Sequence, residues 1–131
     1  MIDLTLAIRI AGVILLCITS ANIFAPEKMR WSANLAKTEL VFRQVFTIHC
    51  VFLLACVVAM ALVSIVRPEW LLTDGLGRAT AGFIALFWGS RILVQLFYYE
   101  PSIKRQYPVF NVLFLVAFVS VTIVYAAAFF N

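Results

Sequence analysis

The sequence predicts an all-α integral membrane protein, a bundle of four antiparallel transmembrane helices in a single domain over residues 1–131. The chain is 65% hydrophobic and only 12% charged, whereas a soluble domain is about half apolar and about a quarter charged. Four apolar runs are each long enough to cross a bilayer, which takes about 20 residues. Prolines next to charged residues mark the ends of these runs. Proline disfavours helix at the residue before it, so these positions are natural span boundaries.

The four spans are expected at residues 4–25, 40–66, 78–99 and 109–130. The prolines at their boundaries are Pro26, Pro68, Pro101 and Pro108. The first span begins with an acid, Asp3, instead of a basic cluster, and its apolar stretch is longer than that of a usual signal peptide. We therefore expect the first apolar run to be a retained transmembrane helix.

Loop charge predicts which way the bundle faces. The first and third loops are basic, with Lys28, Arg30, Lys37, Lys104 and Arg105. The second loop balances its charges, with Arg67, Arg78, Glu69 and Asp74. Basic loops stay in the cytoplasm, so both termini are expected on the non-cytoplasmic side. The net charge of +4 is explained by contact of the basic loops with membrane lipid headgroups. No nucleic-acid partner is expected, because the protein has no basic surface outside the membrane region that could bind nucleic acid.

Ionisable groups within the spans need an explanation, because charge is costly at membrane depth. Arg9 and Arg43 lie near the ends of their spans, from where a long side chain reaches the interface. Arg91 lies nine residues from Glu100, which is about 14 Å along a helix, and His49 lies nine residues into the second span. Since these two spans are antiparallel, His49 and Arg91 are expected at one depth. No acid lies at that depth, so Arg91 favours an anionic partner, either a ligand or another subunit.

Polar side chains gather in the cytoplasmic half of the predicted bundle. On the third span a 3-4-3 spacing places on one helix face Trp88, Arg91, Gln95 and Tyr98. The other spans add Asn22, Gln44, His49 and Asn111. Gln44 lies about 140° around the helix from His49, so the two side chains point in different directions. We predict a wet or ligand-filled pocket with walls of His49, Arg91, Gln95 and Tyr98, and with Asn22 and Asn111 near its mouth. The alternative is that these groups only join helices by hydrogen bonds.

Small residues on two spans predict close helix approach. They are Gly82, Ala85 and Gly89 on the third span, and Ala55 and Ala59 on the second. Such seams permit packing within one chain or between copies, so a homo-oligomer is one expected form of the protein.

The composition excludes several kinds of site. The chain has one histidine, so a bis-histidine haem is not expected, and it has no C-x-x-C pair, which argues against a disulfide oxidoreductase. A zinc site within one chain is not expected, because His49 and Cys50 are adjacent and Cys56 points elsewhere. It has no P-loop, no G-x-G-x-x-G and no nucleophile elbow. No acid lies deep in a span, which argues against a proton-coupled exporter. We predict neither a metal nor a cofactor.

Three functions remain open. The first is a binding module or accessory subunit for a lipid-like ligand with a polar head, such as a quinone, a lipid phosphate or a fatty acid. There, Arg91 would pair with the anion or carbonyl, the hydrogen-bond partners would be Gln95, Tyr98 and His49, and Trp88 would hold the tail. The second is a small oligomeric enzyme for an apolar substrate, with His49 as catalytic acid or base and Arg91 stabilising negative charge. The third is a purely structural subunit of a larger membrane complex.

Overall fold

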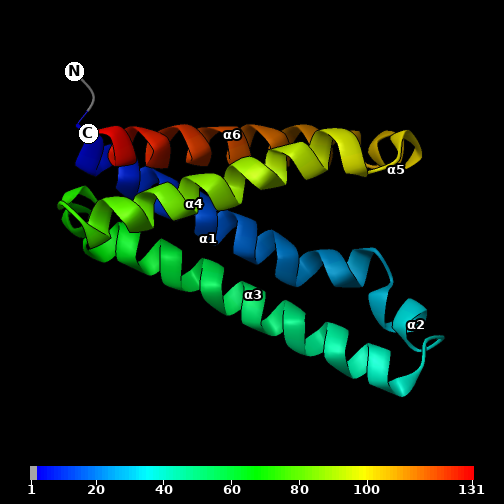
Figure 1. Cartoon of the computed structure of the whole chain (residues 1–131). Helices are drawn as coiled ribbons and strands as arrows, with labels where there is room; N and C mark the ends of the chain where they lie inside the picture. The colour runs from blue at the N-terminus through cyan, green and yellow to red at the C-terminus, as the bar shows by residue number, and fades with distance from the viewer. Residues whose placement is uncertain (1–2) are drawn as a thin grey trace.

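The computed structural model describes residues 3–131, and the described chain is helical, with no strand. Four long helices are α1 (Leu4–Lys28), α3 (Leu40–Val66), α4 (Leu76–Leu93) and α6 (Pro108–Phe130). The short elements are α2 (Trp31–Leu35), the 3₁₀ turn η1 (Pro68–Leu72), the π-helical turn η2 (Val94–Tyr98) and α5 (Pro101–Gln106). Figure 1 shows the long helices as one elongated bundle. The predicted fold class, an all-α four-helix bundle, is confirmed, and the four helices are long and apolar enough for a multi-pass membrane protein.

The helix boundaries lie close to the predicted ones, with differences at the end of the first span and at the start of the third. Pro108 is at the first position of α6, where its missing N–H is not needed. The first helix was expected to stop at Ala25, yet α1 continues through Pro26 to Lys28. Proline removes only one hydrogen bond, the one to the carbonyl of Asn22, and this loss falls in the last turns of the helix. The third span, expected from Arg78, begins two residues earlier at Leu76 and continues from α4 into η2.

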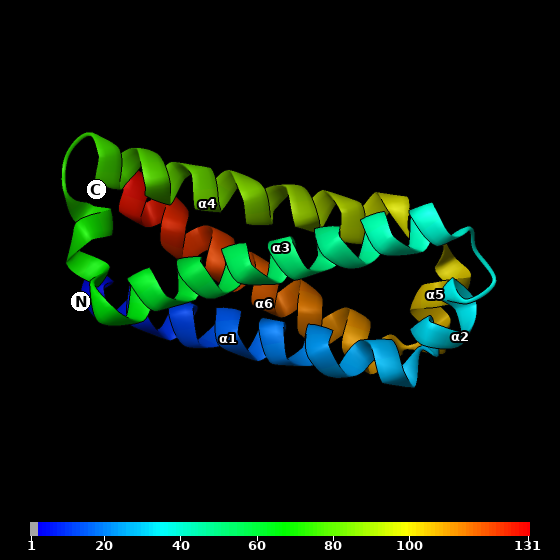
Figure 2. The ribbon, with the colours of Figure 1, turned by 90° about the horizontal axis from the view of Figure 1, so that it is seen from below.

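The bundle is tightly packed at one end and splayed at the other. We call the packed half the closed end; it comprises residues 4–19, 57–72, 76–88 and 118–130 and contains the buried side chains. The open end comprises residues 22–56 and 91–114, and none of its residues is fully buried. In Figure 1, α1 begins and α6 ends at the closed end, while α3 diverges from α4 and α6 toward α2. Figure 2 shows both α2 and α5 at the open end, and in Figure 1 they lie apart there, α5 beside α6 and α2 beside α3.

Small residues set the close contacts of the closed end. A methyl group on Gly12 of α1 would lie 2.8 Å from the Cγ1 atom of Ile65, so α1 and α3 touch backbone to side chain at this point. On α4, Gly82 packs on the ring of Phe129, and a methyl group on Gly89 would lie 3.7 Å from Thr122. The glycines of the predicted third-span seam therefore face α6 of the same chain. On the second-span seam, Ala55 and Ala59 are exposed.

Buried hydroxyl groups of the closed end have hydrogen-bond partners within the chain. Ser64 of α3 and Tyr125 of α6 are both fully buried, and their hydroxyls share a hydrogen bond between the two helices. The Ser64 hydroxyl also donates to the carbonyl of Met60 at 2.7 Å. Thr19 likewise donates to the carbonyl four residues before it, at 2.9 Å. Because no water reaches the interior of a bilayer, such internal partners are what an apolar bundle needs.

Candidate functional site

A cavity of about 370 Å³ lies in the open end, between α1, α4 with η2, α5 and α6. Small-molecule sites have volumes of about 300–1,000 Å³. Trp31 of α2 stands at one edge of the cavity and packs edge-to-face on Phe46 of α3, with ring centroids 5.4 Å apart. Of the described residues, none from α3 lines the cavity, and Figure 1 shows α3 diverging from α4 and α6 at this end. The cavity thus has three helical walls.

Arg91 provides the charge on the cavity wall. It is half-buried on the last turn of α4, and its guanidinium carbon lies 5.5 Å from the ring centroid of Phe118. In the part of the chain that the structure describes, Arg91 forms neither an ion pair nor a hydrogen bond with another residue, and both ion pairs found there lie at the closed end. The expectation of a deep cation without a carboxylate partner agrees with this geometry.

Gln95 and Asn111 form a polar bridge beside Arg91. The Gln95 amide donates to the Asn111 side-chain oxygen at 2.5 Å, which joins η2 to α6. Both side chains also line the cavity. The bridge uses one donor and one acceptor, so the Gln95 carbonyl and the Asn111 amide remain available to a ligand. This corner of the cavity can therefore bind a group that both accepts and donates hydrogen bonds.

Asn22 brings a further acceptor from α1. Its side-chain amide donates to the carbonyl of Ile18 at 2.8 Å, which leaves its side-chain oxygen available. The backbone carbonyl of Asn22 also lacks its helical donor, since Pro26 has no N–H. Asn22 lines the cavity, so α1 offers it hydrogen-bond acceptors while α4 offers the cation.

The structure places Tyr98 outside the cavity, contrary to its expected position in the wall. Its side chain is 79% exposed, and Tyr99 lines the cavity in its place. The cause is η2, since a π-helical turn holds an extra residue relative to an α-helical turn. The 3-4-3 spacing assumed a regular α-helix, and the wide turn shifts the seam by one residue after Gln95.

Lys104 of α5 is a cavity residue that the sequence analysis did not identify. Its amine donates to the carbonyl of Leu96 at 2.7 Å, a carbonyl within η2. Cations near a helix C-terminus stabilise its free carbonyl groups. The contact therefore fixes α5 across the end of the third span and brings a second positive charge to the cavity.

His49 and Gln44 are not brought to the cavity. Both are exposed on the first half of α3, which has no buried residue before Val57. The His49 Nδ1–H donates to the carbonyl of Val45 at 2.8 Å, so the ring bonds to its own helix. Equal depth was the reason to pair His49 with Arg91, but α3 diverges from α4 toward the open end (Figure 1). Arg91 lines the cavity and His49 does not.

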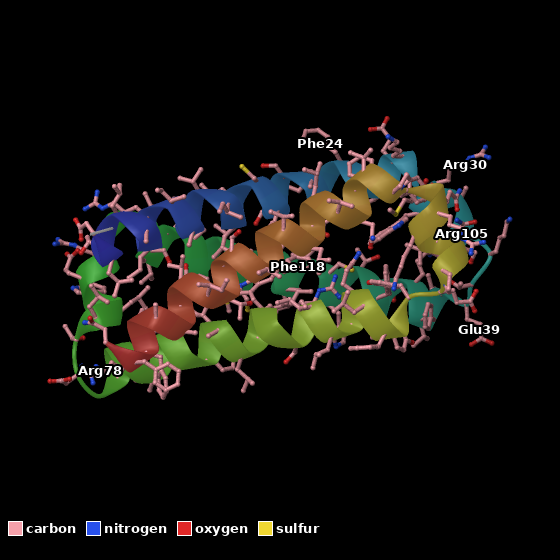
Figure 3. All side chains as sticks on the ribbon, turned by 90° about the horizontal axis from the view of Figure 1, so that it is seen from above. Phe24, Arg30, Glu39, Arg78, Arg105 and Phe118 are labelled. Atoms are coloured by element: carbon pink, nitrogen blue, oxygen red, sulfur yellow. The ribbon has the colours of Figure 1, made fainter. Side chains whose placement is uncertain are left out.

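Trp88 lies behind the cavity and does not line it. Its side chain is only 3% exposed and stacks on Phe118 with centroids 5.3 Å apart. Phe118 itself lines the cavity, near the middle of the bundle in Figure 3. The other aromatic wall residues of α6 are Phe110 and Phe114. Their four-residue spacing on one helix face was a signal in the sequence that could have identified this wall.

No protein-family model, curated protein or solved structure matches the chain. The function must therefore be argued from the geometry of the site. Residues 3–131 contain no group of three or more His, Cys, Asp or Glu side chains arranged to hold a metal ion. What the cavity offers is a cation, several amide groups and an aromatic wall, a combination suited to binding an amphipathic anion.

Proposed function

We propose that this membrane protein is a binding module or accessory subunit that holds an anionic, lipid-like ligand in the open-end cavity. The observation that carries the proposal is the guanidinium of Arg91, which lines the cavity without a carboxylate partner among the described residues. Charged side chains at membrane depth are costly and normally face a partner or a water-filled space. An anion beside Arg91 would remove that cost.

The surrounding residues support a head-and-tail arrangement of the ligand. The head would lie between Arg91, Gln95 and Asn111, which supply the positive charge and both kinds of hydrogen-bonding group. The tail would contact the phenylalanine rings of α6, which are the apolar part of the same wall. Because α3 does not close the cavity, a chain longer than the cavity can continue into the bilayer. This favours a membrane-soluble amphiphile over a small polar anion.

The placement of His49 weighs against the alternative of an enzyme in which His49 acts with Arg91. A general base must come within about 2.6–3.2 Å of the proton that it removes, directly or through one water. His49 lies on α3, which contributes nothing to the cavity lining in the described chain. Binding therefore has better support than catalysis.

The test is native mass spectrometry with lipid extraction on the wild type, Arg91→Gln and Arg43→Gln. Arg43 is the matched control, because it lies in the open end, carries the same charge and does not line the cavity. A hydrogen bond to a charged group contributes about 1.5–3 kcal/mol, so Arg91→Gln should weaken binding by about 10- to 100-fold. We expect a co-purified anionic amphiphile in the wild type and in Arg43→Gln. A wild type without such a ligand, or a ligand that survives Arg91→Gln unchanged, would refute the proposal.

A further inference from the structure

A second hollow lies between α1 and α6 at the open end, next to the cavity that contains Arg91. Its volume is about 120 Å³, and its walls are apolar except at Lys28 and Tyr107. We call it the outer groove. Its other lining residues include Ala21, Phe24, Phe110 and Phe114. The outer groove and the inner cavity adjoin each other and share five lining residues, which are Ala25, Met29, Tyr107, Phe110 and Phe114. The residues that only the outer groove has are Ala21, Phe24 and Lys28.

The outer groove has a polar end and an apolar end. Lys28 is the last residue of α1, and Tyr107 immediately precedes α6, so both belong to the rim of the bundle. Ala21 and Phe114 lie seven residues from them, about 10 Å further into the bundle. The inner cavity is arranged differently, since its cation Arg91 lies deep. A ligand of the outer groove would therefore keep its head at the membrane interface and extend a chain inward.

Lys28 is placed to meet such a head. Its amine lies 4.7 Å from the ring centroid of Phe110, directly over a wall of the groove. Within residues 3–131 it has no ion pair and no hydrogen bond to a protein acceptor, although an ammonium carries three donors. The Tyr107 hydroxyl receives only a long hydrogen bond, 3.4 Å from Gln106, and keeps its own O–H to donate. Two donors thus stand at the rim of an apolar groove.

The charge balance of the open end favours an anionic head. Its loops and helix ends carry six basic residues, Lys28, Arg30, Lys37, Arg43, Lys104 and Arg105, against the three acids Glu27, Glu39 and Glu100. The two ion pairs found in the described chain both lie at the closed end. Basic side chains at a membrane surface attract anionic lipids by about 1 kcal/mol each. The occupant that matches both the charge and the groove is a lipid of the bilayer itself.

We propose that the outer groove binds one anionic glycerophospholipid, with its phosphate against Lys28 and Tyr107 and one acyl chain along Ala21, Phe24 and Phe114. The small volume agrees with this occupant. At about 120 Å³ the groove is below the about 300 Å³ of the smallest ordinary ligand sites, so it holds part of a chain while the rest of the lipid stays in the bilayer. The site adjoins the inner cavity but takes its charge from Lys28 of α1 and not from Arg91 of α4, so charge substitutions distinguish the two.

The experiment measures lipid preference in nanodiscs that contain equal amounts of phosphatidylglycerol and phosphatidylcholine. Lipids retained by the protein are counted by native mass spectrometry for the wild type, Lys28→Gln, Lys28→Arg and Arg30→Gln. Arg30 is the matched control, since it is a cation of the same rim that does not line the groove and projects outward in Figure 3. A hydrogen bond to a charged group contributes about 1.5–3 kcal/mol, so we expect Lys28→Gln to reduce the preference for phosphatidylglycerol about tenfold or more. Arg30→Gln should lose only the general surface attraction, about fivefold at most, and Lys28→Arg should preserve the preference.

Further arms test the chain and separate this site from the inner cavity. Ala21→Leu fills the groove without changing charge and should lower the number of retained lipids of both kinds. Arg91→Gln should leave the preference for phosphatidylglycerol unchanged. The outer-groove proposal therefore fails on the Lys28 variants, and the inner-cavity proposal fails on the Arg91 variant, so the two failures can be told apart. An equal effect of Arg30→Gln and Lys28→Gln would show a general surface charge effect and overturn the proposal. Displacement of the lipid by inorganic phosphate would also overturn it, because it would show that only the anion is bound.

Discussion

Gly12→Ala tests whether the crossing of α1 and α3 is as tight as the structure shows. The new methyl group would lie 2.8 Å from Ile65 Cγ1 and 3.0 Å from both the Ala61 carbonyl oxygen and Ser64 Cβ. Carbon atoms pack best at about 3.5–4.0 Å, so the contact with Ile65 must lengthen by about 0.7 Å, which is 3.5 minus 2.8 Å. A gap of about 0.5–1 Å loses a quarter to a half of the dispersion energy of the contacts that it separates. Overpacking of this kind costs about 1–3 kcal/mol.

Gly89→Ala is the matched control for this prediction. Its methyl group would lie 3.7 Å from Thr122, which is ordinary van der Waals contact. Both substitutions gain the same helix propensity, about 0.8–1.0 kcal/mol, so the difference between them isolates the packing cost. We expect Gly12→Ala to be less stable than Gly89→Ala by about 1–3 kcal/mol in reversible unfolding by SDS in mixed micelles. Equal stability of the two variants, or a more stable Gly12→Ala, would refute the tight crossing.

Three further predictions concern single contacts. Ser64→Ala should destabilise the bundle by about 1–3 kcal/mol, because it leaves the buried Tyr125 hydroxyl without an acceptor. Tyr125→Phe removes that hydroxyl and should cost only about 0.5–1.5 kcal/mol. Unfolding of both variants in SDS measures the order of the two effects, and the reverse order would contradict this reasoning. Lys104→Gln should lower the stability of the bundle by about 0.3–1 kcal/mol and speed amide hydrogen exchange in η2, where the Lys104 amine binds the Leu96 carbonyl. Unchanged exchange in η2 would show that this contact does not stabilise the end of the helix. Trp88, as the sole tryptophan of a variant, should resist fluorescence quenching by both aqueous iodide and brominated lipid, and quenching by either would show that it is not buried.

The helices could be predicted from the sequence because each depends on local information. Apolar run length and proline position gave four spans whose bounds lie close to those of α1, α3, α4 with η2, and α6. The one clear difference is at Pro26, which the helix tolerates near its C-terminal end. Depth along each span was also predictable, because it depends only on counting residues at 1.5 Å each. Depth is why Arg91, Gln95 and Asn111 were expected together, and these three do line one cavity.

The lateral arrangement could not be predicted in the same way. A regular 100° rotation per residue holds for Trp88, Arg91 and Gln95 and then fails at Tyr98, because η2 changes the number of residues per turn. No pattern of apolar and polar residues in Val94–Tyr98 signals that wide turn. His49 was placed by depth alone, and the divergence of α3 from α4 separates it from Arg91. The tight contacts of α3, at Gly12 and Ser64, lie at the closed end and bring residues far apart in the sequence together.

The two ends of the bundle meet the same physical requirement in different ways. In a bilayer a buried polar group needs a partner, and at the closed end the hydroxyls of Ser64 and Tyr125 find one within the chain. At the open end Arg91 and Lys28 have no carboxylate partner among the described residues, and both line hollows. Under the two binding proposals, the open end gains stability from a ligand, whereas the closed end holds the buried core without one. Substitutions at the closed end should change stability whether or not lipid is present, whereas those at Arg91 and Lys28 should act only through what is bound.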